Sequence, residues 1–198
     1  MKTILFLTRH GQTEWNFEHK LDGQEDTQLT AKGIKQAQQL ATHLKKEHID
    51  AIICSPLSRS KKTAEMISDQ VKAPIHEYKE LIEIDCGKCT GRTKKEIKDI
   101  FPKLIKEWDE DTDPQFPNGE NMQDVENRVV PIFKKIVEQF KGKTIVMVGH
   151  GTVNLAFIGQ LLEIPPAVRF KISQSNCCIN EIHFSNEDFS IKSINKRV

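Results

Sequence analysis

Short apolar runs alternate with amphipathic stretches along most of the chain. The runs at 2–8, 51–54 and 143–148 have the length and the Ile, Val and Leu content of buried strands, and 75–78 is a further candidate. Apolar residues recur at helical spacing over 31–46, from 58 onwards and from 122 to 140. Strands that alternate with helices in this way are typical of a mostly parallel sheet with helices on both faces. We therefore predict an α/β fold with three αβα layers.

The remaining segments fit the same domain. Residues 79–120 are less regular, with short helices expected near 93–99 and 101–108 and a loop that contains Pro114, Pro117 and Gly119. Thr30 and Asn121 stand where the N-caps of the helices at 31–46 and 122–140 would lie. A helix at 151–162 and strands near 177–184 and 190–195 complete the pattern. Because neither a repeat nor a linker interrupts it, we interpret residues 1–198 as a single domain.

Composition and charge exclude several classes of protein. Hydrophobic residues make up 37% of the chain and the formal net charge is +1, so no basic excess favours nucleic-acid binding. No apolar run approaches the roughly 20 residues of a membrane span. The apolar stretch near the N-terminus is only four residues long, which indicates a first strand rather than a signal peptide. Five cysteines without a disulfide pattern fit a reducing compartment. We expect a cytoplasmic protein with no nucleic-acid or membrane partner.

Two histidines follow predicted strands directly. His10 comes after the strand at 2–8, and His150 after the strand at 143–148. Ligands of open parallel sheets bind at the carboxyl ends of strands, so we expect both histidines in one site. Arg9 adds a forked donor suited to phosphate oxygens, and Gly11 allows a sharp turn beside the imidazole. The pattern indicates a phosphate site.

Five segments, in order, resemble the histidine phosphatase superfamily, also called phosphoglycerate-mutase-like. They are 9–13 with Asn16, 23–30, 54–59, 81–83 and 148–151. Each lies at a predicted strand end or loop, and together they span nearly the whole chain. The resemblance implies the phosphoglycerate-mutase-like fold and a phosphatase that needs neither metal nor another cofactor.

The resemblance also implies a role for each site residue. His10 would attack phosphorus and carry a phosphohistidine, so it must be neutral, with its other ring nitrogen donating to a backbone carbonyl. Arg9, Arg59 and a protonated His150 would supply positive charge around the phosphate. Glu83 would protonate the leaving alkoxide and then deprotonate the attacking water. Further phosphate-binding candidates, some of which could instead order the loop, are Asn16, Gly23, Gln24 and Gly151.

Two other acidic residues could serve as the general acid in place of Glu83. Glu80 and Asp85 lie close to Glu83 in the sequence. Trp108 and Phe116 either line the pocket or pack in a small satellite core.

The segment at 86–91 departs from many phosphatase members of the family. Cys86 and Cys89 stand at positions that are aromatic there, and Thr90 replaces an acid. We expect Lys88 and Arg92 to lower the thiol pKa and permit a regulatory disulfide. The alternatives are that the cysteines only fill the pocket lining, or that they bind zinc, which normally needs two more ligands.

The same region offers candidates for substrate selectivity. Residues 85–120 should form the roof of the pocket, and Lys88, Arg92 and Lys94 lie close together in it. They form either a solvated basic turn or a site for a second anionic group on the substrate.

Two other functions compete with a phosphatase. Lys94 falls where cofactor-dependent phosphoglycerate mutases of the family place a substrate lysine, but no arginine lies between Arg92 and Arg128, where such mutases carry an adjacent pair. A non-catalytic phospho-ligand-binding relative could have lost its nucleophile or acid, whereas this chain keeps both. We therefore favour a phosphatase whose partner is a small phosphorylated metabolite. The late strands could also form an edge-to-edge homodimer.

Overall fold

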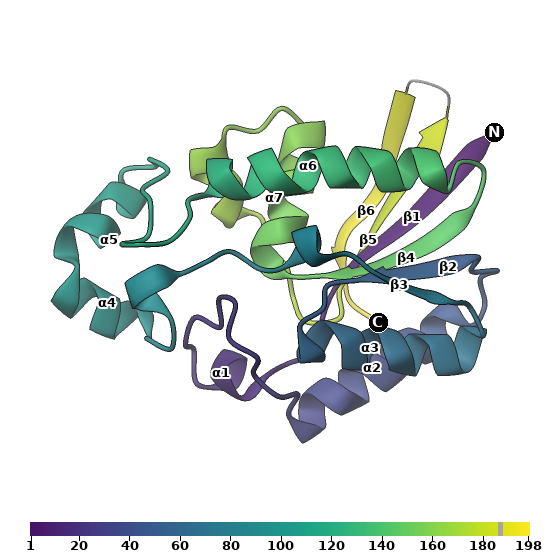
Figure 1. Cartoon of the computed structure of the whole chain (residues 1–198), viewed down its shortest axis with the longest axis horizontal. Coiled ribbons are helices and arrows are strands. Elements are labelled where there is room, and N and C mark those ends of the chain that lie inside the picture. Colours follow the sequence, from purple (N-terminus) through teal and green to yellow (C-terminus); the bar gives the residue numbers. More distant parts are fainter. Residues whose placement is uncertain (186–187) are drawn as a thin grey trace.

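The computed structural model describes residues 1–185 and 188–198, and in these residues six strands form one sheet (Figure 1). The strands are β1 (Lys2–Arg9), β2 (Ala51–Cys54), β3 (Ile75–Glu77), β4 (Thr144–Gly149), β5 (Ile179–Ser185) and β6 (Asp188–Lys196). Their order is β3-β2-β4-β1-β5-β6, in which β3, β2, β4 and β1 run parallel. Strands β5 and β6 pair antiparallel at one side. The predicted α/β fold with a mostly parallel sheet is confirmed.

The predicted helices are present, with ends that differ by one or two residues. They are α2 (Ala31–Leu44), α3 (Ser58–Val71), α4 (Lys94–Ile100), α5 (Pro102–Asp109), α6 (Met122–Gln139) and α7 (Gly151–Leu161). Thr30 caps α2 by accepting from the backbone of Gly33, and Asn121 forms a capping box with Asp124 at the start of α6. Four short elements were not predicted, because one or two turns leave no periodic signal. They are α1 (Glu14–Phe17), η1 (Lys79–Leu81), η2 (Gly87–Cys89) and η3 (Pro166–Lys171).

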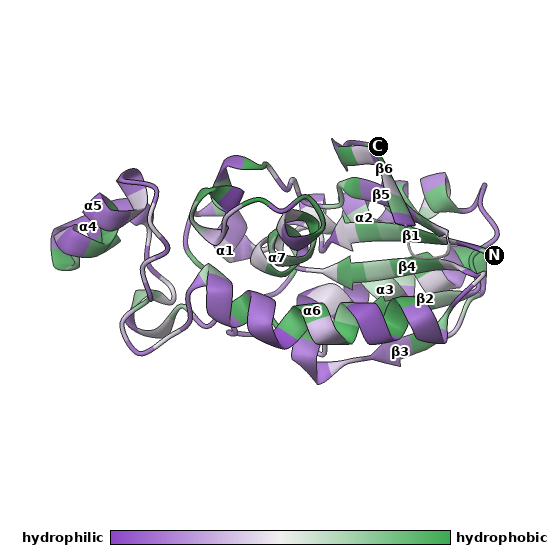
Figure 2. Cartoon of the chain, turned by 90° about the horizontal axis from the view of Figure 1, so that it is seen from above, coloured by the Kyte–Doolittle hydropathy of each residue, from purple (hydrophilic) through white to green (hydrophobic). Residues whose placement is uncertain are grey.

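Helices cover both faces of the sheet. Helices α2 and α3 pack on one face, and α6 and α7 on the other (Figure 1). Figure 2 shows hydrophilic and hydrophobic residues alternating along α6 and mostly hydrophobic residues in the central strands β1 and β4. Helix α7 is apolar nearly all round and lies buried. No helix within the described residues is long and apolar enough to cross a membrane.

One end of the sheet is left open for a site. Strands β1 and β4 pair in parallel, so their carboxyl ends meet there. Helices α4 and α5 form a hairpin that extends from this end of the molecule (Figure 1). The segment that we expected as a roof therefore stands beside the strand ends.

Candidate active site

The register of the two central strands brings the two histidines together. Arg9 of β1 pairs with Gly149 of β4, so His10 and His150 each lie one residue beyond paired positions. Their ring centroids are 5.1 Å apart, and both side chains are buried. The juxtaposition expected from the sequence is present.

The imidazole of His10 is held by the turn that follows β1. Its Nδ1 lies 2.7 Å from the carbonyl oxygen of Gly11, which can only accept, so Nδ1 carries the proton. The turn is locked against α2, because a Cβ at Gly11 would lie 2.5 Å from the carbonyl oxygen of Gly33. The Gly11 N–H donates to the hydroxyl of Thr63. The orientation of His10 thus depends on close backbone packing.

His10 is neutral in this environment. Burial lowers its pKa well below the ordinary range, and the positive charges of Arg59 and Arg9 lower it further, against the smaller opposing effect of the Gly11 hydrogen bond. With Nδ1 protonated, Nε2 keeps its lone pair. His10 therefore meets the electronic requirement for a nucleophile.

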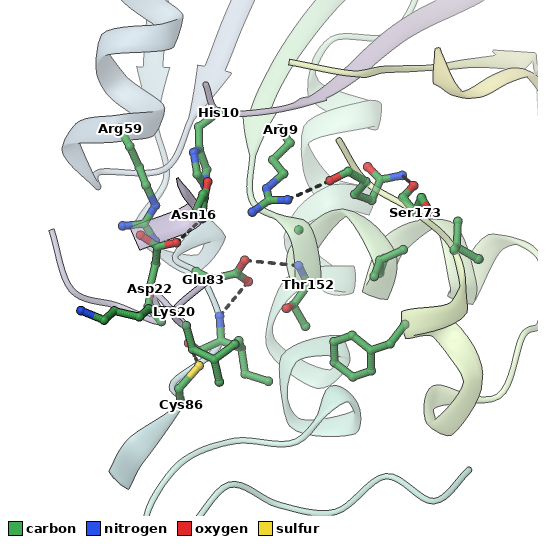
Figure 3. A pocket seen from close by; sticks show the side chains of 18 residues that line it. Arg9, His10, Asn16, Lys20, Asp22, Arg59, Glu83, Cys86, Thr152 and Ser173 are labelled. Atoms are coloured by element: carbon green, nitrogen blue, oxygen red, sulfur yellow. Dashed lines mark hydrogen bonds between the residues drawn. The ribbon is translucent and has the colours of Figure 1, made fainter. Parts of the chain in front are cut away.

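Two arginines surround the cavity into which His10 faces (Figure 3). Arg59 is fully buried and donates to the carbonyl oxygens of Gly23, at 2.7 Å, and Glu25. Arg9 donates to the carbonyl oxygen of Gln174 at 2.8 Å. The Nε atoms of both arginines are buried, and neither has a hydrogen-bond partner among the described residues. Unpaired buried donors are costly, and an anion in this cavity of about 280 Å³ could satisfy them.

His150 is fully buried beside His10 and the two arginines. Burial lowers its pKa well below the ordinary range, and Arg59, His10 and Arg9 lower it further. Neither ring nitrogen has a hydrogen-bond partner within the described part of the chain. These effects disfavour the charged form of His150 in the ligand-free protein. A phosphate dianion would offset the surrounding cations and favour its protonation.

Glu83 supplies a carboxyl group to the same cavity. It is 9% exposed, with Oε1 accepting from the N–H of Ile84 at 2.9 Å and Oε2 from the N–H of Thr152 at 3.3 Å. The alternatives Glu80 and Asp85 do not line the cavity. The geometry therefore favours Glu83 as the acid.

The remaining phosphate-binding candidates separate into two groups. Asn16, Gly23 and Gly151 line the cavity. A Cβ at Gly151 would lie 3.8 Å from both the Arg9 guanidinium and the Glu83 carboxylate, so a side chain there would narrow the cavity. Gln24 does not line it. The Gln24 amide instead donates to the carbonyl oxygen of Glu83 at 3.1 Å, which fits the alternative of a loop-ordering residue.

A second carboxylate in the cavity was missed by the sequence reasoning. Asp22 is buried and accepts from the hydroxyls of Thr13 and Thr27 and from the amide of Asn16. It therefore ties the two ends of the segment at 13–27 together. The only signal in the sequence for this role of Asp22 is the presence of Thr and Asn residues within about ten positions of it.

Arg128 of α6 was also missed. Its guanidinium forms an ion pair with Glu120 at 2.7 Å and donates to the carbonyl oxygens of Glu80, Ile82 and Glu83. It thus holds the segment that carries Glu83. No local motif marks this residue, because the carbonyls that it binds lie 45 to 48 positions away in the sequence.

The basic residues of the roof do not gather around the phosphate cavity. Arg92 is exposed and donates to the carbonyl oxygen of Lys88 at 3.0 Å, as expected of a solvated turn. Lys94 is 71% exposed, pairs with Asp109 at 3.4 Å and lines a neighbouring cavity. For Arg92 these contacts favour the alternative of a solvated basic turn, whereas Lys94 stands at the edge of the neighbouring cavity.

The cysteines also differ from the expectation of reactive thiols. All five are free and buried. Burial raises the pKa of Cys86 and of Cys89, and the nearby Glu83 carboxylate raises that of Cys86 further. Arg92 lowers the pKa of Cys89, but by less than burial raises it. Burial outweighs the expected activation by Lys88 and Arg92, and Cys86 lies in the lining of the phosphate cavity, which fits the alternative that the cysteines fill the pocket wall. Within the described residues, no three His, Cys, Asp or Glu are grouped as metal ligands.

Comparisons with known proteins agree with this geometry. Residues 5–197 match the family model "Histidine phosphatase superfamily (branch 1)". The "Uncharacterized phosphatase PhoE" of Bacillus subtilis is 30% identical over 98% of this chain and 94% of its own. The "Probable phosphoglycerate mutase GpmB" of Escherichia coli is 30% identical over 91% and 84%. A phosphoserine phosphatase from Entamoeba histolytica, solved in complex with 3-phosphoglyceric acid, superposes with a TM-score of 0.88 at 31% identity, covering 98% of this chain and 97% of its own. The chain belongs to the histidine phosphatase superfamily.

Proposed function

We propose that this protein is a metal-independent phosphatase that hydrolyses small phosphomonoesters through a phosphohistidine on His10. One observation carries the proposal. The neutral His10 has a free Nε2 beside two arginines whose buried Nε atoms lack partners among the described residues, and all three line one cavity. Phosphatase names among the relatives support the same reaction class.

In the first half-reaction, Nε2 of His10 attacks phosphorus and the bond from phosphorus to the ester oxygen breaks. Glu83 gives its proton to the leaving oxygen, which departs as an alcohol. The arginines stabilise the charge on the three equatorial oxygens, and a cation about 4 Å from such an oxygen contributes about 4 kcal/mol at an effective dielectric constant near 20.

In the second half-reaction, water attacks the phosphohistidine. Glu83, now ionised, accepts the proton of the water while the bond from phosphorus to Nε2 breaks. Inorganic phosphate leaves, and His10 and Glu83 regain their starting states. The bound phosphoryl dianion keeps His150 protonated during both steps.

A phosphoglycerate mutase is the second candidate, because a relative of equal identity carries that name. It would share the first half-reaction but pass the phosphoryl group to a second hydroxyl instead of water. The test is a panel of phosphorylated metabolites and 4-nitrophenyl phosphate, assayed for phosphate release. In parallel, 3-phosphoglycerate is assayed for isomerisation with 2,3-bisphosphoglycerate present. We expect phosphate release to exceed isomerisation. Faster isomerisation would establish the mutase, and no turnover at all would indicate a non-catalytic relative.

A further inference from the structure

A carboxylate lies in the wall of the phosphate cavity, where its charge would oppose an anionic ligand. Asp22 is 8% exposed and lines the cavity together with Asn16 and Arg59. Charges of the same sign repel at close range, so the charge of Asp22 alone would weaken the binding of a phosphate dianion. A carboxylate at this place therefore needs a compensating role, and its hydrogen bonds indicate what that role is.

Asp22 determines which way the amide of Asn16 points. The Nδ2 of Asn16 donates to Oδ2 of Asp22 (Figure 3). Oδ1 of Asp22 accepts from the hydroxyls of Thr13 at 2.8 Å and Thr27 at 2.5 Å, which hold the carboxylate in place. Because a carboxylate can only accept hydrogen bonds, the amide nitrogen of Asn16, and not its oxygen, must face Asp22.

Asn176 holds the oxygen of the same amide. Its Nδ2 donates to Oδ1 of Asn16 at 2.9 Å and to the backbone carbonyl of His10 at 3.1 Å. The N–H of Thr13 also donates to Oδ1 of Asn16, at 3.4 Å. An amide oxygen has two lone pairs, and both are occupied here. Asn176 and Asp22 therefore favour the same orientation of the Asn16 amide.

In this orientation Asn16 offers a donor to the cavity. One N–H of its amide is bound to Asp22, and the other has no partner among the residues that the structure describes. Because Asn16 lines the cavity, this N–H is available to a phosphate oxygen. A phosphate dianion has only acceptors, so a free N–H stabilises it, whereas the amide oxygen of a flipped Asn16 would repel it.

We propose that Asp22 and Asn176 are positioning residues that keep the donor of the Asn16 amide towards the phosphate. The proposal rests on the proposed function, because it takes a phosphoryl group as the ligand of this cavity. The stabilisation that the oriented donor contributes exceeds the repulsion that Asp22 adds. Asn176 also binds the carbonyl of His10, so one side chain holds both the peptide of the nucleophile and the amide that binds phosphate.

The test is Asp22→Asn, which removes the negative charge and keeps the shape of the side chain. If Asp22 acted by its charge alone, this variant would bind phosphate more tightly. We expect it to bind inorganic phosphate about tenfold more weakly, because the new amide can offer an N–H to Asn16 and allow the Asn16 amide to turn over. Isothermal titration calorimetry measures both affinities without turnover, and circular dichroism reports whether the variant is folded.

A double-mutant cycle tests whether Asp22 acts through Asn16. In an Asn16→Ala background, Asp22→Asn should no longer weaken phosphate binding. The matched control is Asp26→Asn, because Asp26 is exposed, accepts from the N–H of Ser58 at 2.7 Å and does not line the cavity. This control should change the phosphate affinity by less than about twofold, since solvent and salt screen an exposed charge.

Asn176→Ala should weaken phosphate binding in the same direction, by about threefold, because the N–H of Thr13 still holds the oxygen of Asn16. Unchanged or tighter binding by Asp22→Asn, or equal weakening in the Asn16→Ala background, would overturn the inference and leave the phosphatase intact. The predicted losses of phosphate affinity in a protein that hydrolyses no ester would support the inference and overturn the proposed function.

Discussion

The guanidinium of Arg128 donates a hydrogen bond of 2.9 Å to the backbone carbonyl of Glu83, the proposed general acid. The same guanidinium binds the carbonyls of Glu80 and Ile82, and its ion pair with Glu120 fixes its own position. The segment that carries Glu83 has little regular structure, so its position depends on the Arg128 side chain from α6. Arg128 is therefore a positioning residue for Glu83.

Replacing Arg128 should affect activity through Glu83. Arg128→Met leaves Glu120 and three carbonyls without their donor, and we expect a loss of about 3 kcal/mol in the free energy of unfolding. We also expect kcat on phenyl phosphate to fall about tenfold more than kcat on 4-nitrophenyl phosphate, because the poorer leaving group needs the proton. Glu83→Gln should show the same split.

Lys141→Met is the matched control for this prediction. Lys141 forms an exposed ion pair with Glu138, so its loss should change stability by no more than about 0.5 kcal/mol and leave the leaving-group dependence unchanged. If Arg128→Met slowed both esters equally, Arg128 would be structural only.

The two site histidines should have pKa values below that of an ordinary histidine. Burial and the neighbouring arginines lower both pKa values, so the ligand-free protein should keep His10 and His150 neutral below pH about 6.5, where an unfolded histidine becomes protonated. Nitrogen NMR of the imidazoles measures this directly. Adding phosphate should shift His150 towards the imidazolium form. A charged His150 in the ligand-free protein at neutral pH would contradict the account.

The same shifts predict the direction of a change in stability. The unfolded chain binds protons at these histidines more readily than the folded protein, so the free energy of unfolding should fall as the pH drops below about 6.5. Urea denaturation at pH 7 and 5.5 measures this change. His150→Gln should reduce the slope, and an unchanged slope would show that His150 does not resist protonation.

Activity should persist without metal ions. Arg9 and Arg59 provide positive charge around the phosphate. We therefore expect that no divalent ion is needed to offset the negative charge of the substrate. Hydrolysis of 4-nitrophenyl phosphate after exhaustive EDTA treatment should remain within about twofold of the untreated rate. Loss of activity that Mg²⁺ or Zn²⁺ restores would contradict this prediction.

The thiols should be inert while the protein is folded. Burial raises the pKa of Cys54 and of Cys177 to about 12, and Cys86 and Cys89 are shifted in the same direction. Labelling with Ellman's reagent should therefore be slow in the native protein and fast in guanidinium chloride. Diamide should not inhibit. Rapid modification of one thiol with parallel loss of activity would restore the redox hypothesis.

Local patterns were enough to predict the frame of the fold and the juxtaposition of its two histidines. Apolar runs of strand length mark β1 and β4, and each is followed directly by a histidine. Because parallel strands end at one edge, pairing β1 with β4 brings His10 and His150 together without further information.

Properties that depend on distant segments were not predictable. The lowered pKa of His150 results from its burial beside two arginines, which no sequence neighbour indicates. Arg128 reaches Glu83 from another helix. Lys88 adjoins Cys89 in the sequence, yet the lysine is exposed and the thiol is buried. Their short separation predicts a lowered pKa for the Cys89 thiol, whereas burial raises it.

The proposed mechanism requires that His10 becomes covalently phosphorylated. Glu83→Gln should slow hydrolysis of the intermediate more than its formation from 4-nitrophenyl phosphate, so this variant is the best protein in which to trap it. After an alkaline quench, mass spectrometry should find one phosphoryl group on the peptide containing His10, and acid should remove it. His10→Ala should be folded, unlabelled and inactive, while the surface control His48→Ala should behave as wild type. Turnover by His10→Ala, or a phosphoryl group on any other residue, would contradict the account.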